Sequence, residues 1–343
     1  MRVSSKKIAC LLLALLLVMS MLAGCAKPAP EEESTFAWKL QSGYGPGDQT
    51  WDVQMPIIVD AIQTASNGRI TIETFIPGAI CEPEQAPISV ANGLLECAIS
   101  APGDTGQFVP AAYAEQGIPF FWLNGQDVYD NFYDYGMLDF LRTEYAKAGL
   151  YYGMYVPNGA YGFMTTFPIN SIDDLKGKKI RASSSYGEFV NQLGAAPVTM
   201  PGGDIYMGLK LGTIDGCVYT LGELGPGKLM EVATDVMVQP AAGSAPVNFI
   251  IGQKAWDALP ADLQEAVNMA LQDSFMKIYD ASVAVDVKSF EAAKAYGVTF
   301  TEVSPENMVA FYDAGLRTAD FVIAKSPEAA QGIELIKTWK EAQ

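Results

Sequence analysis

Histidine is absent from this chain of 343 residues. Its absence excludes Ser-His-Asp and Cys-His nucleophile systems and any zinc or iron site with histidine ligands. A hydrolase with paired carboxylates, or a Ser-Lys enzyme, is left open by the many acidic residues and serines, but no spacing supports either. We therefore expect a protein that is not an enzyme, with no catalytic residue and no cofactor.

Cysteine is scarce, and no two cysteines stand in a CxxC spacing. The five are Cys10, Cys25, Cys81, Cys97 and Cys217. A metal knuckle or a redox pair is therefore not expected, and Cys97 and Cys217 are interpreted as small buried hydrophobic residues in strands. The pattern leaves a disulfide involving Cys81 open.

Basic residues are few, 22 against 39 acidic ones. Past the first ten residues, the only cluster of basic residues is Lys176, Lys178, Lys179 and Arg181. We interpret it mainly as a solvated turn. Binding a nucleic acid requires a basic stripe, so no nucleic-acid partner is expected. An acidic protein can still bind a small anion, because distant carboxylates are screened within about 10 Å.

Only one long apolar run occurs, over residues 8–22, and it follows Arg2, Lys6 and Lys7. This is the layout of a secretory signal, and the run is shorter than the roughly 20 residues that span a bilayer. The sequence from Leu22 to Cys25, LAGC, reads as a lipobox. We therefore predict a signal peptide over 1–24 and acyl chains on Cys25 that hold the protein on a membrane.

The residues that follow, 25–35, are polar and rich in proline, and are expected to form a flexible tether. Cleavage before Cys25 removes three of the 22 basic residues and none of the 39 acidic ones, which leaves 19 against 39 and a net charge of −20. The expected location is extracytoplasmic, in the periplasmic space or on the outer face of the membrane.

About 308 residues follow the tether, too many for one core and suitable for two α/β lobes. Helical and strand periodicities alternate, as an α/β fold requires. Helices are expected over 51–66, 84–91, 129–148, 187–193, 203–211, 260–295 and from 304, and strands over 70–75, 97–100, 151–156, 179–182, 214–219, 248–252 and 298–303. We predict lobe 1 from 36–158 plus 246–286 and lobe 2 from 159–245 plus 287–343, joined by two crossing segments that can hinge.

Arg181 is the most informative residue. It ends a short predicted strand, after a turn at 176–178 and before a helix start at 186–188. Ligands commonly bind at such strand ends, and the guanidinium fork matches a carboxylate. The alternative is an ordinary ion pair with an acidic neighbour such as Glu188.

The segment 174–216 resembles the substrate-binding proteins of tripartite ATP-independent periplasmic (TRAP) transporters. The matching residues are Asp174, Leu175, Lys176, Gly177, Ile180, Arg181, Gly194, Ala195, Pro197, Val198, Met200, Pro201, Asp204, Ile205, Tyr206, Leu209, Gly212, Ile214, Asp215 and Gly216. The resemblance implies a two-lobed fold of the type II periplasmic-binding-protein kind, with a long helix bridging both lobes. It further implies that Arg181 holds the carboxylate of a small organic acid, which the receptor captures by lobe closure and delivers to the small and large integral-membrane subunits.

Departures from the family pattern narrow the range of substrates that we expect. Phe163 stands where sialic-acid and dicarboxylate members carry a second arginine, and Tyr219 stands where dicarboxylate members place an asparagine. The run from Gly202 resembles 2-oxo-acid members, whose sodium ligands, a glutamate and a tryptophan, are replaced here by Val218 and Tyr219. No metal is therefore expected.

One charged group in aromatic surroundings suits a monocarboxylate, such as a 2-oxo or hydroxy acid or an aromatic or branched aliphatic acid. We expect Phe163, Tyr219, Tyr186 and Tyr44 to line the pocket, with Trp51 near its rim. Two alternatives remain, the binding lipoprotein of an ATP-driven importer and a secreted hydrolase that uses paired carboxylates.

Overall fold

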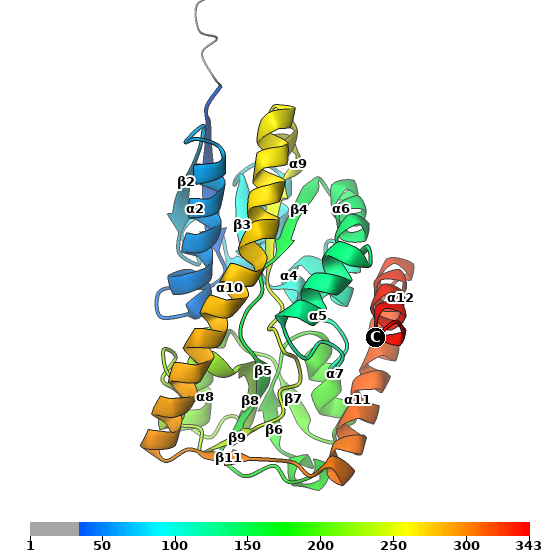
Figure 1. Ribbon diagram of the computed structural model, residues 1–343. Coiled ribbons are helices and arrows are strands. Elements are labelled where there is room, and N and C mark those ends of the chain that lie inside the picture. The colour runs from blue at the N-terminus through cyan, green and yellow to red at the C-terminus, as the bar shows by residue number, and fades with distance from the viewer. Residues whose placement is uncertain (1–33) are drawn as a thin grey trace, which may run out of the picture. The chain divides into compact units, whose positions relative to one another are not determined.

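Two β-sheets organise the chain in the computed structural model, which describes residues 34–343. Residues 36–343 form one unit, and Cys25 and the predicted signal peptide lie outside the described residues. Figure 1 shows the sheets one beyond the other along the long helix α10 (Ala261–Tyr296). The two-lobed α/β fold with a long bridging helix, as predicted, is therefore confirmed.

The first sheet has the strand order β2-β1-β3-β10-β4. Its strands are β1 (Phe36–Ser42), β2 (Ile70–Phe75), β3 (Cys97–Ser100), β4 (Leu150–Tyr155) and β10 (Asn248–Gly252). Strand β1 is parallel to β2 and β3, and β10 is antiparallel to β3 and β4. The helices and helical turns between these strands are η2 (Thr50–Gln54), α2 (Met55–Ala65), η3 (Pro83–Gln85), α3 (Ala86–Ala91), α4 (Pro102–Gly106), η4 (Pro110–Gln116), α5 (Gly125–Tyr129), η5 (Asp130–Asp134), α6 (Met137–Lys147) and α9 (Gln253–Asp257).

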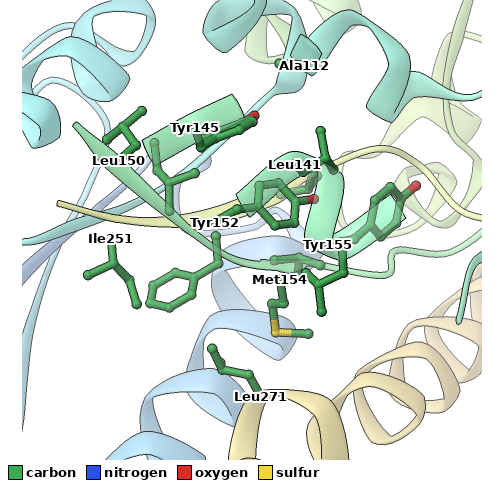
Figure 2. Close-up of a cluster of buried hydrophobic side chains, with 14 of the residues drawn as sticks. Ala112, Leu141, Tyr145, Leu150, Tyr152, Met154, Tyr155, Ile251 and Leu271 are labelled. Carbon is green, nitrogen blue, oxygen red and sulfur yellow. The ribbon is translucent and has the colours of Figure 1, made fainter. Parts of the chain in front are cut away.

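Aromatic and aliphatic side chains fill the core of this sheet. Helices α6 and α10 pack against β4, and Figure 2 shows Leu141 and Tyr145 near Tyr152, with Leu271 near Met154. All five side chains are fully buried, as the apolar periodicity of these segments predicts.

The second sheet has the strand order β11-β9-β5-β8-β6-β7. Its strands are β5 (Tyr161–Thr165), β6 (Lys179–Arg181), β7 (Ala196–Val198), β8 (Gly216–Thr220), β9 (Asp235–Met237) and β11 (Thr299–Thr301). Strand β6 is parallel to both of its neighbours, β7 and β8, and β5 is antiparallel to β8 and β9. The helices and turns here are η6 (Ile172–Leu175), α7 (Ser185–Gln192), η7 (Gly202–Asp204), α8 (Ile205–Lys210), η8 (Leu221–Leu224), η9 (Leu229–Glu231) and α11 (Pro305–Ile323).

Helix α10 has 36 residues, about 54 Å at 1.5 Å per residue, and packs against α2 on one side and η8 on the other. The predicted bounds, 260–295, are confirmed within one residue. Its buried face is apolar from Leu263 to Ile278 except for Ser274, and it is small or polar from Ser282 to Ala293. The polar half contacts the segments that join the two sheets.

Two antiparallel segments, residues 156–161 and 242–247, join the sheets. Val156 N donates to Val247 O (2.9 Å), Ala245 N to Gly159 O (3.0 Å) and Tyr161 N to Ala242 O (2.9 Å). The lobe boundaries themselves stay a prediction. Helix α12 (Pro327–Glu341) places its buried residues in the core of the first sheet, which favours counting this last helix with lobe 1.

Several helices and strands were not predicted from the sequence, and one helix was predicted incorrectly. Strands β1, β5, β7 and β9 and helix α12 were not predicted. The single helix expected over 129–148 is wrong, because Gly136 takes a left-handed conformation with φ 84° and separates η5 from α6. Cys97 and Cys217 are buried in β3 and β8, as expected. Cys81 is free and half-buried, and no disulfide joins it to another described residue.

Gly243, in the joining segment after β9, packs closely against backbone, and a substitution there tests this packing through the stability of the protein. A Cβ added there would lie 2.1 Å from the carbonyl carbon of Leu123, which is backbone. Overpacking of this kind costs about 1 to 3 kcal/mol, so Gly243→Ala should lower the thermal midpoint by roughly 2 °C or more. Gly203→Ala is the control, since nothing lies within 4 Å of its added Cβ. Equal midpoints for both variants in calorimetry would contradict the packing described.

Candidate functional site

Arg181 is the last residue of β6. It lies at the end of the second sheet where the parallel strands β6, β7 and β8 all terminate. Its side chain is buried, with 6% of the residue exposed. Nε and Nη2 donate to the carbonyl oxygen of Met200 at 3.1 and 3.0 Å. Nη1 is buried and has no hydrogen-bond partner within residues 34–343. A buried charged donor that lacks an acceptor is costly, so this atom indicates a place for an anion.

The alternative of an ordinary ion pair does not hold within the described chain. Arg181 makes no salt bridge there. Glu188 instead accepts hydrogen bonds from Asn191 and Gln192 on its own helix, α7. The guanidinium charge is therefore not neutralised by a neighbouring carboxylate in direct contact.

Tyrosines surround the guanidinium. The Cζ of Arg181 lies 5.2 Å from the ring centre of Tyr219 on β8, a cation–π contact. The ring of Tyr161, on β5, lies 6.4 Å from that of Tyr219 and 4.9 Å from that of Tyr186. Burial raises the pKa of Tyr161, and the positive charge of Arg181 opposes the rise. Burial also raises the pKa values of Tyr186 and Tyr219, so all three phenols are neutral.

Groups from the first lobe face the same place. Tyr219 Oη donates to Asp48 Oδ2 at 3.3 Å. Burial raises the pKa of Tyr44, with contributions from Asp48 and Asp104 that Arg181 opposes. Burial also raises the pKa of Asp104 to about 6, again opposed by Arg181. The site is thus built from loops of the first sheet and strand ends of the second.

The structure brings together some of the predicted site residues and not others. Gly202 lies against Tyr219, since an added Cβ would be 2.6 Å from Tyr219 Oη. Phe163 and Val218, a cross-strand pair, are fully buried in the core of the second sheet. The ring of Phe163 contacts those of Phe189 and Phe311 at 6.0 and 6.5 Å. Tyr161, two residues before Phe163, approaches the charge instead.

The two other residues predicted near the pocket, Tyr186 and Trp51, lie in different parts of the structure. Tyr186 is buried beneath Tyr161, and its Oη is another buried atom without a partner in the described chain. Trp51 is half-buried and packs on the core of the first sheet. The residues that sequence reasoning missed are Tyr161 and the acids Asp48 and Asp104, because nothing in their spacing marks them as neighbours of Arg181.

No three acidic or cysteine side chains within residues 34–343 are placed to hold a metal ion. The expected absence of a metal stays a prediction. In the same part of the chain, no helix is both long and apolar enough to cross a membrane.

Acidic side chains are buried where the two lobes meet. Glu223 accepts from Gln49 N at 3.1 Å, and Asp286 on α10 accepts from Ala160 N at 2.7 Å. Burial raises the pKa of Glu223 to about 8, with a further contribution from Asp48. Burial raises the pKa of Asp286 to about 7. Both carboxyl groups therefore bind a proton more readily in this conformation than they would in water.

The fold and site together define a two-lobed extracytoplasmic solute receptor. The family model for bacterial extracellular solute-binding protein, family 7, matches residues 50–325, and the chain belongs to this family of TRAP solute receptors. It is 25% identical over 315 residues to the ectoine-binding periplasmic protein TeaA of Halomonas elongata, covering 90% of this chain and 91% of that one. It is 26% identical over 288 residues to the monocarboxylate 2-oxoacid-binding periplasmic protein all3028 of Nostoc sp., covering 80% and 74%.

Solved structures show the same fold. A TRAP transporter solute-binding protein of Bordetella bronchiseptica, with calcium and picolinate bound, superimposes with a TM-score of 0.80 at 23% identity, covering 90% of this chain and 93% of that one. A TRAP solute-binding protein of Desulfovibrio salexigens with bound orotic acid gives a TM-score of 0.79 at 21% identity, covering 90% and 98%. The type II two-lobed architecture implied by the sequence resemblance is confirmed by these neighbours.

The acids at the lobe junction predict how stability depends on pH. An acid whose pKa is raised by folding binds more protons in the folded than in the unfolded state, so the free energy of unfolding falls as pH rises from about 5 to 8. Glu223→Gln should make this fall less steep and raise the thermal midpoint at pH 8. It should not abolish the fall, because burial also raises the pKa of Glu115 to about 8.

Thermal unfolding between pH 5 and 8.5 provides the measurement. Glu334→Gln, at an exposed position of α12, is the control and should leave the slope unchanged. A midpoint that rises with pH in the wild-type protein, or a Glu223→Gln slope equal to that of the wild type, would overturn the assignment.

Proposed function

We propose that this receptor captures an organic monocarboxylate between its lobes and delivers it to the integral-membrane subunits of a TRAP transporter. The observation that carries the proposal is the buried Arg181, whose Nη1 has no acceptor within the described chain. A carboxylate placed there would accept from Nη1 and neutralise the charge, which the surrounding phenols cannot do. The family membership supports delivery to a TRAP system rather than to an ATP-driven importer.

Lobe closure is supported by direct contacts across the site. Tyr219 reaches Asp48, Glu223 accepts from Gln49 N, and Ser185 N donates to Gln116 Oε1 at 3.0 Å. These hydrogen bonds join loops of the first lobe to the second. A bound anion that touches both sides would add to them and shift the population toward the closed form, which a membrane partner would recognise.

A single positive group favours a monocarboxylate over a dicarboxylate. Where sialic-acid and dicarboxylate members carry a second arginine, the strand β5 of this chain has Phe163. The relative from Nostoc is named as a receptor for monocarboxylate 2-oxoacids, and the neighbour from Bordetella holds picolinate, an aromatic monocarboxylate. We assign the site to Arg181, Tyr219, Tyr44 and Gly202, with Tyr186 behind them. The receptors related to it also favour a binding role over catalysis.

Removal of the guanidinium tests the function. Truncating a buried charge partner costs about 2 to 5 kcal/mol, so Arg181→Ala should weaken binding by roughly 30-fold or more. Calorimetric titration with 2-oxo, 2-hydroxy, aromatic and branched monocarboxylates, with succinate for comparison, measures this effect. Lys179→Ala, at an exposed position on the same strand, is the matched control and should bind like the wild type. Tight binding of succinate with no binding of any monocarboxylate would refute the substrate class.

We further propose that the receptor is held at the membrane by acyl chains on Cys25, as the lipobox predicts. Metabolic labelling with an alkynyl fatty acid, followed by fractionation, tests this anchor. The wild-type protein should be labelled and sediment with membranes, whereas Cys25→Ser should lose the label. Label retained in Cys25→Ser would assign the acylation elsewhere.

A further inference from the structure

Residues 116–121 form an arm that leaves the first lobe and packs on the second. Both ends of this arm are held in the first lobe. Glu115, directly before it, is fully buried and accepts from Asn248 Nδ2 at 3.1 Å. Trp122, directly after it, is buried in the core of the first sheet, with its ring centre 5.9 Å from that of Phe132. Whatever the arm contacts in the second lobe therefore connects the two lobes.

Gln116 makes the first of these contacts. Its Oε1 accepts from the backbone N–H of Ser185 at 3.0 Å and also from Ser185 Oγ. Both residues are buried, so water does not compete for these hydrogen bonds. Ser185 is the first residue of α7 and stands four residues after Arg181. The arm therefore holds the start of the helix that follows the strand carrying the arginine.

Phe120 makes the second contact. Its backbone N–H donates to Ala241 O at 2.7 Å. Its ring centre lies 5.7 Å from that of Phe189 on α7 and 5.0 Å from that of Tyr312 on α11, both in edge-on geometry. The residue is 6% exposed and belongs to the apolar core of the second lobe. An aromatic side chain of one lobe therefore fills a site between two helices of the other.

The position of Phe120 is strained and lies near the protein surface. Tyr312, which contacts its ring, is 48% exposed. Phe120 itself has φ 68°, a conformation that is unfavourable for a bulky residue. Such strain persists only while surrounding contacts offset it, and here those contacts come from the second lobe. Separation of the lobes would remove the contacts and release the strain, so the arm is suited to withdraw.

We propose that the arm is a latch for lobe closure, in which Gln116 and Phe120 dock on the second lobe as the lobes close and withdraw as they open. This inference rests on the lobe closure of the proposed function and is independent of the ligand. The latch raises the population of the closed form before a ligand arrives. Because apparent affinity scales with the population of the binding-competent form, Gln116 and Phe120 are positioning residues that tune capture without touching the ligand.

Small-angle X-ray scattering of the ligand-free receptor tests the latch, because separation of the lobes increases the radius of gyration. Phe120→Ala should increase this radius relative to the wild-type protein. Phe121→Ala is the matched control, since the neighbouring phenylalanine of the same arm packs on the core of the first lobe and its loss should leave the radius unchanged. Gln116→Ala should also increase the radius, and it keeps the test decisive if Phe120→Ala does not fold. Thermal midpoints establish which variants are folded.

Hydrogen exchange provides a local readout on the same variants. In Phe120→Ala, the amide of Ser185, which donates to Gln116, should exchange at least about threefold faster, whereas the amides of β10 in the first sheet should keep their wild-type rates. If Phe120→Ala and Gln116→Ala keep the wild-type radius, or if Phe121→Ala expands the receptor as much as Phe120→Ala, the latch proposal fails. The carboxylate proposal would then still stand, because no ligand takes part in this test.

Discussion

The buried guanidinium of Arg181 has one nitrogen without a hydrogen-bond acceptor among the described residues, and this constrains the rest of the site. Met200 O accepts from two nitrogens of Arg181, and the ring of Tyr219 covers its face, but Nη1 has no acceptor among the described residues. Burying a charge without a counter-ion costs several kcal/mol. Evolution of a stable fold would ordinarily supply a carboxylate at contact distance. Its absence from the described chain makes sense if the counter-ion arrives from solution.

The scaffold around this charge is built so that its halves can separate. Where α10 passes the junction, its buried face changes from leucine and phenylalanine to Ser282, Asp286 and Ser289. These side chains bond to the backbone of the joining segments and of η8, with Ser289 Oγ donating to Gly222 O at 2.6 Å. A junction held by hydrogen bonds loses less on exposure to water than an apolar one, because water replaces each bond. Each lobe has its own apolar core, and Phe120 of the first lobe packs into that of the second, with its ring centre 5.7 Å from that of Phe189.

Local sequence signals predicted the parts of the fold that depend on local chemistry. Helix α10 follows from a run without proline or glycine that ends at Gly297, and the N-cap at Ser304 follows from Ser-Pro. The position of Arg181 at a strand end came from the turn before it and the motif around it. Through-space relations were not accessible. Tyr161 and Phe163 lie on the same face of β5, and only the tertiary structure shows that the first meets the charge while the second fills the core. The turn at Gly103 is distant in sequence from Arg181, and only the tertiary structure shows that it packs against Ser184, three residues after Arg181.

A strand-end arginine held by a backbone carbonyl provides affinity for carboxylates, and it is insensitive to the remainder of the ligand. Discrimination must then come from the groups that face it, since specificity is a difference of affinities. In this chain those groups are neutral phenols from both lobes, together with the acids Asp48 and Asp104 from the first lobe. The two acids would repel a second negative charge, whereas Arg181 would attract one carboxylate. In the proposed function, groups from both lobes therefore contribute to the choice among carboxylates.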